Sequence, residues 1–106
     1  MARISTHILD IARGKPAEGV VVQLFHQLEM LCAATTNADG RTDRPLLQAD
    51  AIPAGAYELQ FSVGDYLPRP AFFEVIRISF VVSDEQANYH VPLLLAPHGY
   101  STYRGS

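Results

Sequence analysis

Residues 57–63 of this chain read YELQFSV, a stretch in which apolar and polar side chains alternate without interruption. The apolar side chains, at every second position from Tyr57 to Val63, fall on one face of an extended chain, and the polar ones fall on the other. This period of two residues predicts a β-strand with one face in a hydrophobic core.

Similar segments lie on both sides of this stretch. Residues 74–82 (EVIRISFVV) keep one face apolar throughout, and residues 20–28 (VVVQLFHQL) start with β-branched side chains, which favour strands. Further strand-like segments cover residues 4–9, 89–95 and about 100–103, and turn signals rich in Gly, Pro and Asp separate the segments at 14–16, 38–40, 53–55, 64–65 and 97–99. Five to eight short strands are therefore expected.

The fold class that this pattern predicts is all-β, a two-sheet antiparallel β-sandwich. The chain has no long amphipathic helical stretch, and only residues 83–87 and 65–71 are suited to a short helical turn. Pro68 and Pro70 argue against a longer helix in the second segment. With 106 residues, no linker and no internal repeat, residues 1–106 are expected to form a single domain.

Composition argues against several functional classes. The formal charge of −3 without a basic block makes nucleic acid an unlikely partner, and no apolar run approaches the roughly 20 residues that a membrane helix needs. Cys32 is the single cysteine, so no intrachain disulfide is expected, and we interpret it as a small buried hydrophobic residue. No apolar signal segment follows Met1, which favours a cytoplasmic location.

Few side chains are suited to catalysis, and the chain has neither a Gly-rich phosphate loop nor a His-Glu-x-x-His helix. The candidates are His7, His90, Arg41 after the turn at 37–40, and the tail 100–106 with its two tyrosines. Each has a structural alternative: His7 suits a strand histidine bonded to a neighbouring carbonyl, and Arg41 suits a hairpin tip. His90 lies in an otherwise apolar segment, where an imidazole without a hydrogen-bond partner costs about 1–3 kcal/mol.

Four motifs follow one another along the chain: STHILD at 5–10, NADGR at 37–41, YHVPLL at 89–94 and YRGS at 103–106. Together they resemble the 5-hydroxyisourate hydrolases, the transthyretin-related enzymes of purine catabolism. In that family the terminal Tyr-Arg-Gly-Ser distinguishes the enzymes from the hormone-carrying transthyretins. The resemblance covers nearly the whole chain. It departs at residues 67–71, where family members commonly carry a longer insert with a short helix.

The resemblance implies a transthyretin-like sandwich that assembles as a homotetramer, a dimer of dimers, with active sites at the dimer–dimer interface. The implied reaction is the hydrolysis of 5-hydroxyisourate to 2-oxo-4-hydroxy-4-carboxy-5-ureidoimidazoline in urate degradation, without a metal or organic cofactor. The implied catalytic residues are His7 and His90, which activate water and transfer protons, and Arg41, which binds substrate oxygens. Tyr103 and Ser106 would add contacts to the substrate, and the terminal carboxylate would raise the histidine pKa values.

Three alternatives stay open at this point. The first is a transthyretin-like carrier that binds a small hydrophobic ligand without catalysis. The second is a zinc site built from His7 and His90 of neighbouring subunits, although two nitrogens without a Cys or carboxylate make a poor structural site. The third is a structural sandwich without activity. The sequence does not decide which histidine is the general base.

Overall fold

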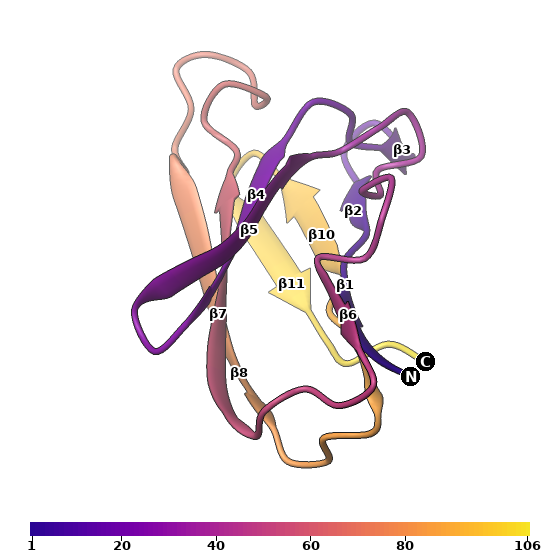
Figure 1. Ribbon diagram of the computed structural model, residues 1–106. Helices are drawn as coiled ribbons and strands as arrows, with labels where there is room; N and C mark the ends of the chain where they lie inside the picture. Colours follow the sequence, from indigo (N-terminus) through magenta and orange to yellow (C-terminus); the bar gives the residue numbers. More distant parts are fainter.

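The alternating stretch forms the centre of a four-stranded antiparallel sheet in the computed structural model, which describes residues 1–106 (Figure 1). The strand order is β5 (Glu29–Thr35), β4 (Val21–His26), β7 (Gly55–Ser62) and β8 (Val75–Val82). Leu24, Leu59 and Phe61 point inward and are fully buried. Burying one such side chain stabilises the fold by about 1.5–3 kcal/mol, so this face supplies much of the core.

The second layer contains two short sheets that follow each other. One has the order β6 (Leu47–Ala49), β1 (Ala2–Ser5) and β9 (Asn88–His90), and the other has the order β11 (Gly99–Thr102), β10 (Leu93–Ala96), β2 (Ile8–Asp10) and β3 (Lys15–Pro16). Strand β1 pairs with β9 in parallel, and β2 pairs with β10 in parallel. The first and the late segments of the chain therefore run side by side through this layer.

The two chain segments that pair in parallel are each interrupted at the same level. One break lies between β1 and β2, and the other lies between β9 and β10. The amide of Val91 donates to Ser5 O at 2.9 Å and the amide of Leu93 donates to His7 O at 2.9 Å, so hydrogen bonding continues across the break. Pro92 lies between them and has no amide hydrogen to give to the ladder. The two expected strands at 4–9 and 89–95 are thus four strands, and two candidate histidines, His7 and His90, lie at their junctions.

The all-β sandwich expected from the sequence is confirmed, and several details differ. The second layer is mixed rather than antiparallel because of its two parallel pairings, and the chain has eleven strands, more than the five to eight expected. No helix is present: the segment after β7 makes one turn, closed by the Leu67 amide and Val63 O at 2.9 Å. Cys32 is only partly buried, against the core rather than within it.

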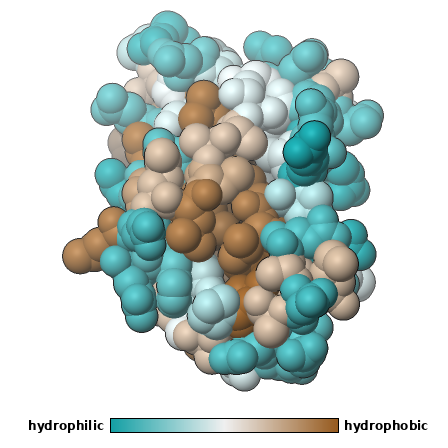
Figure 2. All heavy atoms as spheres, viewed as in Figure 1, coloured by the Kyte–Doolittle hydropathy of each residue, from teal (hydrophilic) through white to brown (hydrophobic).

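The β4–β5 hairpin carries four exposed apolar side chains, Val21, Leu28, Met30 and Leu31. Figure 2 shows an apolar patch in the middle of the face viewed in Figure 1, bordered by polar residues. Polar and titratable groups instead gather on the other layer, around β1 and β9. None of the chain forms a helix of the length and hydrophobicity that a membrane span needs.

Candidate active site

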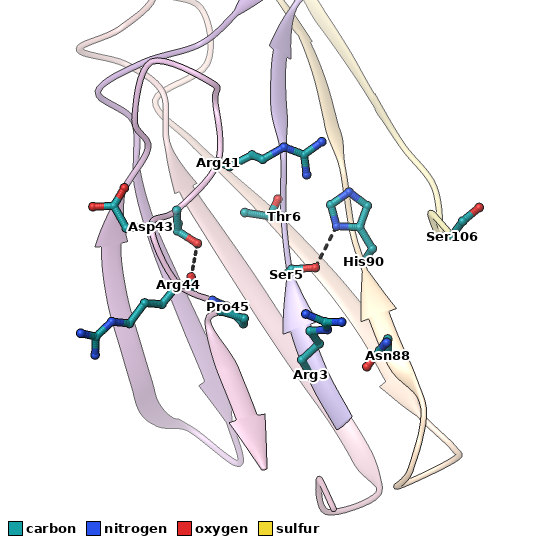
Figure 3. A pocket seen from close by; sticks show the side chains of 11 residues that line it. Arg3, Ser5, Thr6, Arg41, Asp43, Arg44, Pro45, Asn88, His90 and Ser106 are labelled. Carbon is teal, nitrogen blue, oxygen red and sulfur yellow. Dashed lines mark hydrogen bonds between the residues drawn. The ribbon is translucent and has the colours of Figure 1, made fainter. Parts of the chain in front are cut away.

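A polar cavity of about 500 Å³ opens beside β1 and β9, at the junction where both strands are interrupted (Figure 3). Its walls contain no large hydrophobic side chain. The lining residues come from β1, from the loop after residue 40, from β9 and from the end of the chain: Arg3, Ser5, Thr6, Arg41, Thr42, Asp43, Arg44, Pro45, Asn88, His90 and Ser106. A ligand that fits this cavity must be polar or charged.

His90 is held in this cavity by the parallel pairing of β1 with β9. The register places Ser5 opposite His90, and Ser5 Oγ lies 2.9 Å from His90 Nδ1 (Figure 3). This hydrogen bond uses Nδ1, so Nε2 is the ring nitrogen left for a substrate or a water molecule. The imidazole therefore has the hydrogen-bond partner that its half-buried position requires.

Arg41 is positioned by the tight turn that precedes it. The Asn37 side-chain oxygen accepts a hydrogen bond from the Arg41 amide at 3.3 Å, and Gly40 has a φ of +74°. A Cβ at Gly40 would collide with the carbonyl oxygen of Ile8, so this turn needs glycine for space as well as for conformation. The turn brings Arg41 into an antiparallel bridge with His7.

Burial and the Arg41 guanidinium keep both imidazoles neutral. Burial lowers the pKa of His7 from its ordinary 6.5 and Arg41 lowers it further, while Asp39 partly opposes the shift. Burial, Arg41 and His7 lower the pKa of His90 in the same way. The direction is opposite to the one expected from the carboxylate of Ser106. Both histidines are consequently able to accept a proton at neutral pH.

We expect Arg41→Gln to raise the pKa of both histidines, because it removes a positive charge that disfavours the imidazolium form. The values should stay below 6.5, since burial is the larger cause and persists. Proton NMR titration of the imidazole resonances measures the shift directly. Arg69→Gln, in the exposed loop between β7 and β8, is the matched control and should leave both titrations unchanged. Titrations in Arg41→Gln that match the wild type would show that Arg41 does not act on these groups.

The last three residues close one side of the cavity. The Gly105 amide donates to His90 O at 2.7 Å, and a Cβ at Gly105 would lie 2.6 Å from His90 Cδ2. The Arg104 guanidinium lies 4.3 Å from the centre of the Tyr89 ring, and its Nη2 donates to Asn88 O at 3.2 Å. The tail is thereby fastened along β9, and the terminal residue lines the cavity.

Four of the five residues singled out from the sequence come together. Arg41, His90 and Ser106 line the cavity, and His7 lies next to it, bridged to Arg41 and close enough for its charge to lower the pKa of His90. Tyr103 does not join this group. It is 56 % exposed and contributes to a separate groove beside β8.

Sequence reasoning missed eight lining residues: Arg3, Ser5, Thr6, Thr42, Asp43, Arg44, Pro45 and Asn88. Two of them, Arg3 and Ser5, carry a recognisable signal. The alternation that places His7 on a face with Ser5 extends back to Arg3 and could have identified both. No group of three or more His, Cys, Asp or Glu side chains is arranged to hold a metal ion.

The sequence and the fold of this chain are both similar to those of known proteins. The family model described as HIUase/Transthyretin family matches residues 4–105. Curated proteins named 5-hydroxyisourate hydrolase are 47 % identical in Ralstonia nicotianae, with all of both chains covered, and 48 % identical in Halalkalibacterium halodurans, with 98 % of each covered. The solved structure of Klebsiella pneumoniae 5-hydroxyisourate hydrolase is 43 % identical with a TM-score of 0.88, covering all of both chains. Sea bream transthyretin in complex with thyroxine is 25 % identical with a TM-score of 0.87, over 97 % of this chain and 94 % of that one.

Proposed function

The chain belongs to the HIUase/Transthyretin family, and from that membership we infer that it is a hydrolase of 5-hydroxyisourate in urate degradation. The observation that carries this inference is the polar cavity in which Arg41 and His90 meet, with His7 beside it. A carrier for a hydrophobic ligand needs a site lined by hydrophobic residues, and none lines this cavity. A cytoplasmic location is part of the same proposal.

The reaction opens a cyclic amide. The oxygen of water bonds to a ring carbonyl carbon, the adjacent C–N bond breaks, one proton of the water goes to the ring nitrogen, and the other is released to solvent as the carboxylate forms. The attack needs a base, a donor for the developing oxyanion and a fixed geometry. We assign the proton transfers to His7 and His90, since their lowered pKa values favour the neutral, proton-accepting form. The imidazolium formed in the first step then has a proton to return to the leaving nitrogen.

We assign Arg41 to the substrate oxygens, because a guanidinium offers paired donors in a planar fork. Ser106 is proposed to contact the substrate through its hydroxyl or its terminal carboxylate, since it lines the same cavity. We assign the Tyr103 hydroxyl a hydrogen bond to the substrate as well. Because Tyr103 lies in the groove beside β8, this contact requires the cavity of a neighbouring copy of the chain.

Ultraviolet absorbance of freshly generated 5-hydroxyisourate tests the function directly. The protein is expected to accelerate the loss of substrate well beyond its slow spontaneous decay. A preparation that carries His7→Ala and His90→Ala together controls for contaminating enzymes and should decay at the spontaneous rate. Wild-type protein that leaves the decay unchanged would contradict the proposed activity.

We propose a homotetramer, a dimer of dimers, as the working assembly. Strands β8 and β11 are the edges of their sheets, and beside them runs a groove of about 230 Å³ lined partly by Ile78, Phe80 and Tyr103. Open edges and apolar side chains of this kind favour pairing with a second copy across a two-fold axis. Light scattering at low micromolar concentration is expected to give the mass of four 11.7 kDa chains. A stable monomer there would contradict the assembly.

A further inference from the structure

The cavity carries more positive charge than the family motifs account for. Three guanidinium side chains line it, Arg3, Arg41 and Arg44, and none of them belongs to either of the two ion pairs of the chain. Two negative groups stand against them: the Asp43 carboxylate, which accepts a hydrogen bond from Asn37 at 3.0 Å, and the terminal carboxylate of Ser106. The chain as a whole has a formal charge of −3, so this local excess is opposite in sign to the rest of the molecule.

Arg3 is the second guanidinium that extends toward the histidine. Figure 3 shows the Arg3 side chain running along β1 toward Ser5 and His90, whereas the Arg44 side chain points away from them. Arg3 shares a face of β1 with Ser5, two residues further, which corresponds to a spacing of about 7 Å along the strand. Its register partner in β9 is Asn88, two residues before His90.

We propose that Arg3 is a substrate-binding residue that holds the negatively charged end of a planar purine-like anion, away from the carbonyl group that reacts at His90 and Arg41. This assignment rests on the proposed function for the identity of the substrate. The two arginines are assigned different tasks. The Arg41 guanidinium lowers the pKa of both histidines and so acts on the reacting groups. Arg3 lines the same cavity two residues before Ser5 on β1 and is assigned to the charged end of the substrate.

A residue that binds substrate and transition state equally changes KM and leaves kcat unchanged. We expect Arg3→Gln to raise KM about tenfold, the effect of losing one charge-assisted hydrogen bond. The value of kcat should stay within about twofold, and the acid limb of its pH profile should not move. In the wild type, kcat/KM should fall with added NaCl more steeply than in Arg3→Gln, because an attractive charge has been removed from the variant.

Arg69→Gln is the matched control for these measurements, since it removes the same charge from an exposed position in the loop between β7 and β8. It should behave as the wild type in KM, kcat and salt dependence. If Arg3→Gln is indistinguishable from Arg69→Gln in KM, kcat and salt dependence, the proposal is overturned. So would a loss of kcat at unchanged KM, which would place Arg3 in the chemistry instead.

Equilibrium binding gives a readout that does not depend on turnover. Urate is a planar monoanion at neutral pH and hypoxanthine is a neutral purine, so calorimetric titration with both isolates the effect of ligand charge. We expect Arg3→Gln to weaken urate binding about tenfold and to leave hypoxanthine binding unchanged. Equal weakening of both ligands, or of neither, would overturn the role of Arg3.

The two measurements separate failure of this inference from failure of the proposed function. If the wild-type protein hydrolyses 5-hydroxyisourate and Arg3→Gln binds urate normally, only the proposed role of Arg3 is overturned. A different outcome is that the wild-type protein does not hydrolyse 5-hydroxyisourate, whereas Arg3→Gln selectively weakens urate binding. That outcome would overturn the proposed hydrolase activity and leave an anion-binding site at Arg3.

Discussion

Replacement of His90 by alanine is expected to lower kcat about a hundredfold or more, the usual contribution of a general acid–base group. Its Nδ1 is engaged by Ser5, its Nε2 is available to the substrate, and its lowered pKa keeps the ring neutral at neutral pH. His7→Ala is expected to cause a loss of similar size, because the two imidazoles share the proton transfers. Steady-state kinetics of both variants by the absorbance assay gives the two values.

Thermal unfolding of the same variants separates catalysis from packing. The two side chains are partly exposed, so their removal should change Tm little. His98→Ala is the matched control: His98 is exposed in the turn between β10 and β11 and should tolerate the change in both kcat and Tm. A variant of His90 that is strongly destabilised, yet fully active per folded molecule, would show that the imidazole serves the fold alone.

Gly105→Ala is expected to lower kcat by roughly ten- to a hundredfold without touching any group that reacts. The new Cβ would lie 2.6 Å from His90 Cδ2, while the Gly105 amide stays bonded to the carbonyl of the same residue. Either the ring turns away from Ser5 or the tail lifts from β9. A misplacement of about 1 Å in a catalytic group is enough for a loss of this order. Gly105 is in this sense a positioning residue for His90.

Gly99→Ala provides the control for this variant, because a Cβ at Gly99 meets nothing within 4 Å. It should keep normal kcat. In Gly105→Ala the NMR resonances and the pKa of His90 should change together with kcat, whereas a general loss of stability would lower Tm and leave the titration intact. Normal kcat in Gly105→Ala would show that the tail does not hold the ring in place.

The fold could be predicted from the sequence where alternation is strong. Residues 57–63 and 74–82 were expected as strands and correspond to β7 and β8, since both bury one face and leave the other exposed. Strand β5 was missed because it is an edge strand with mostly exposed side chains and no regular alternation in EMLCAAT. The interruption of two strands at one level was missed as well, because it depends on the pairing of residues far apart in the chain.

The candidate site was predicted by motif resemblance, and its geometry was not. Ser5 and His90 are 85 residues apart, so no local pattern reveals the hydrogen bond between them. The lowered pKa values follow from burial and from the turn that brings Arg41 to His7, and both are properties of the folded chain. Tyr103 was grouped with Ser106 because they are close in sequence, but they lie in different hollows of the surface.

The parallel pairing of β1 with β9 also determines when the protein can fold during its synthesis. Strand β1 lies between β6 and β9, and β2 lies between β3 and β10, so both are internal strands of their sheets. Their parallel neighbours are synthesised 85 residues later, as the pairs Arg3–Asn88 and Ile8–Leu93 show. Contacts of such long sequence separation make folding slow and leave strand edges open in nascent chains. The early strands of the nascent chain therefore stay without their parallel partners until residues 88–96 have been synthesised, and the cavity between β1 and β9 cannot form before then.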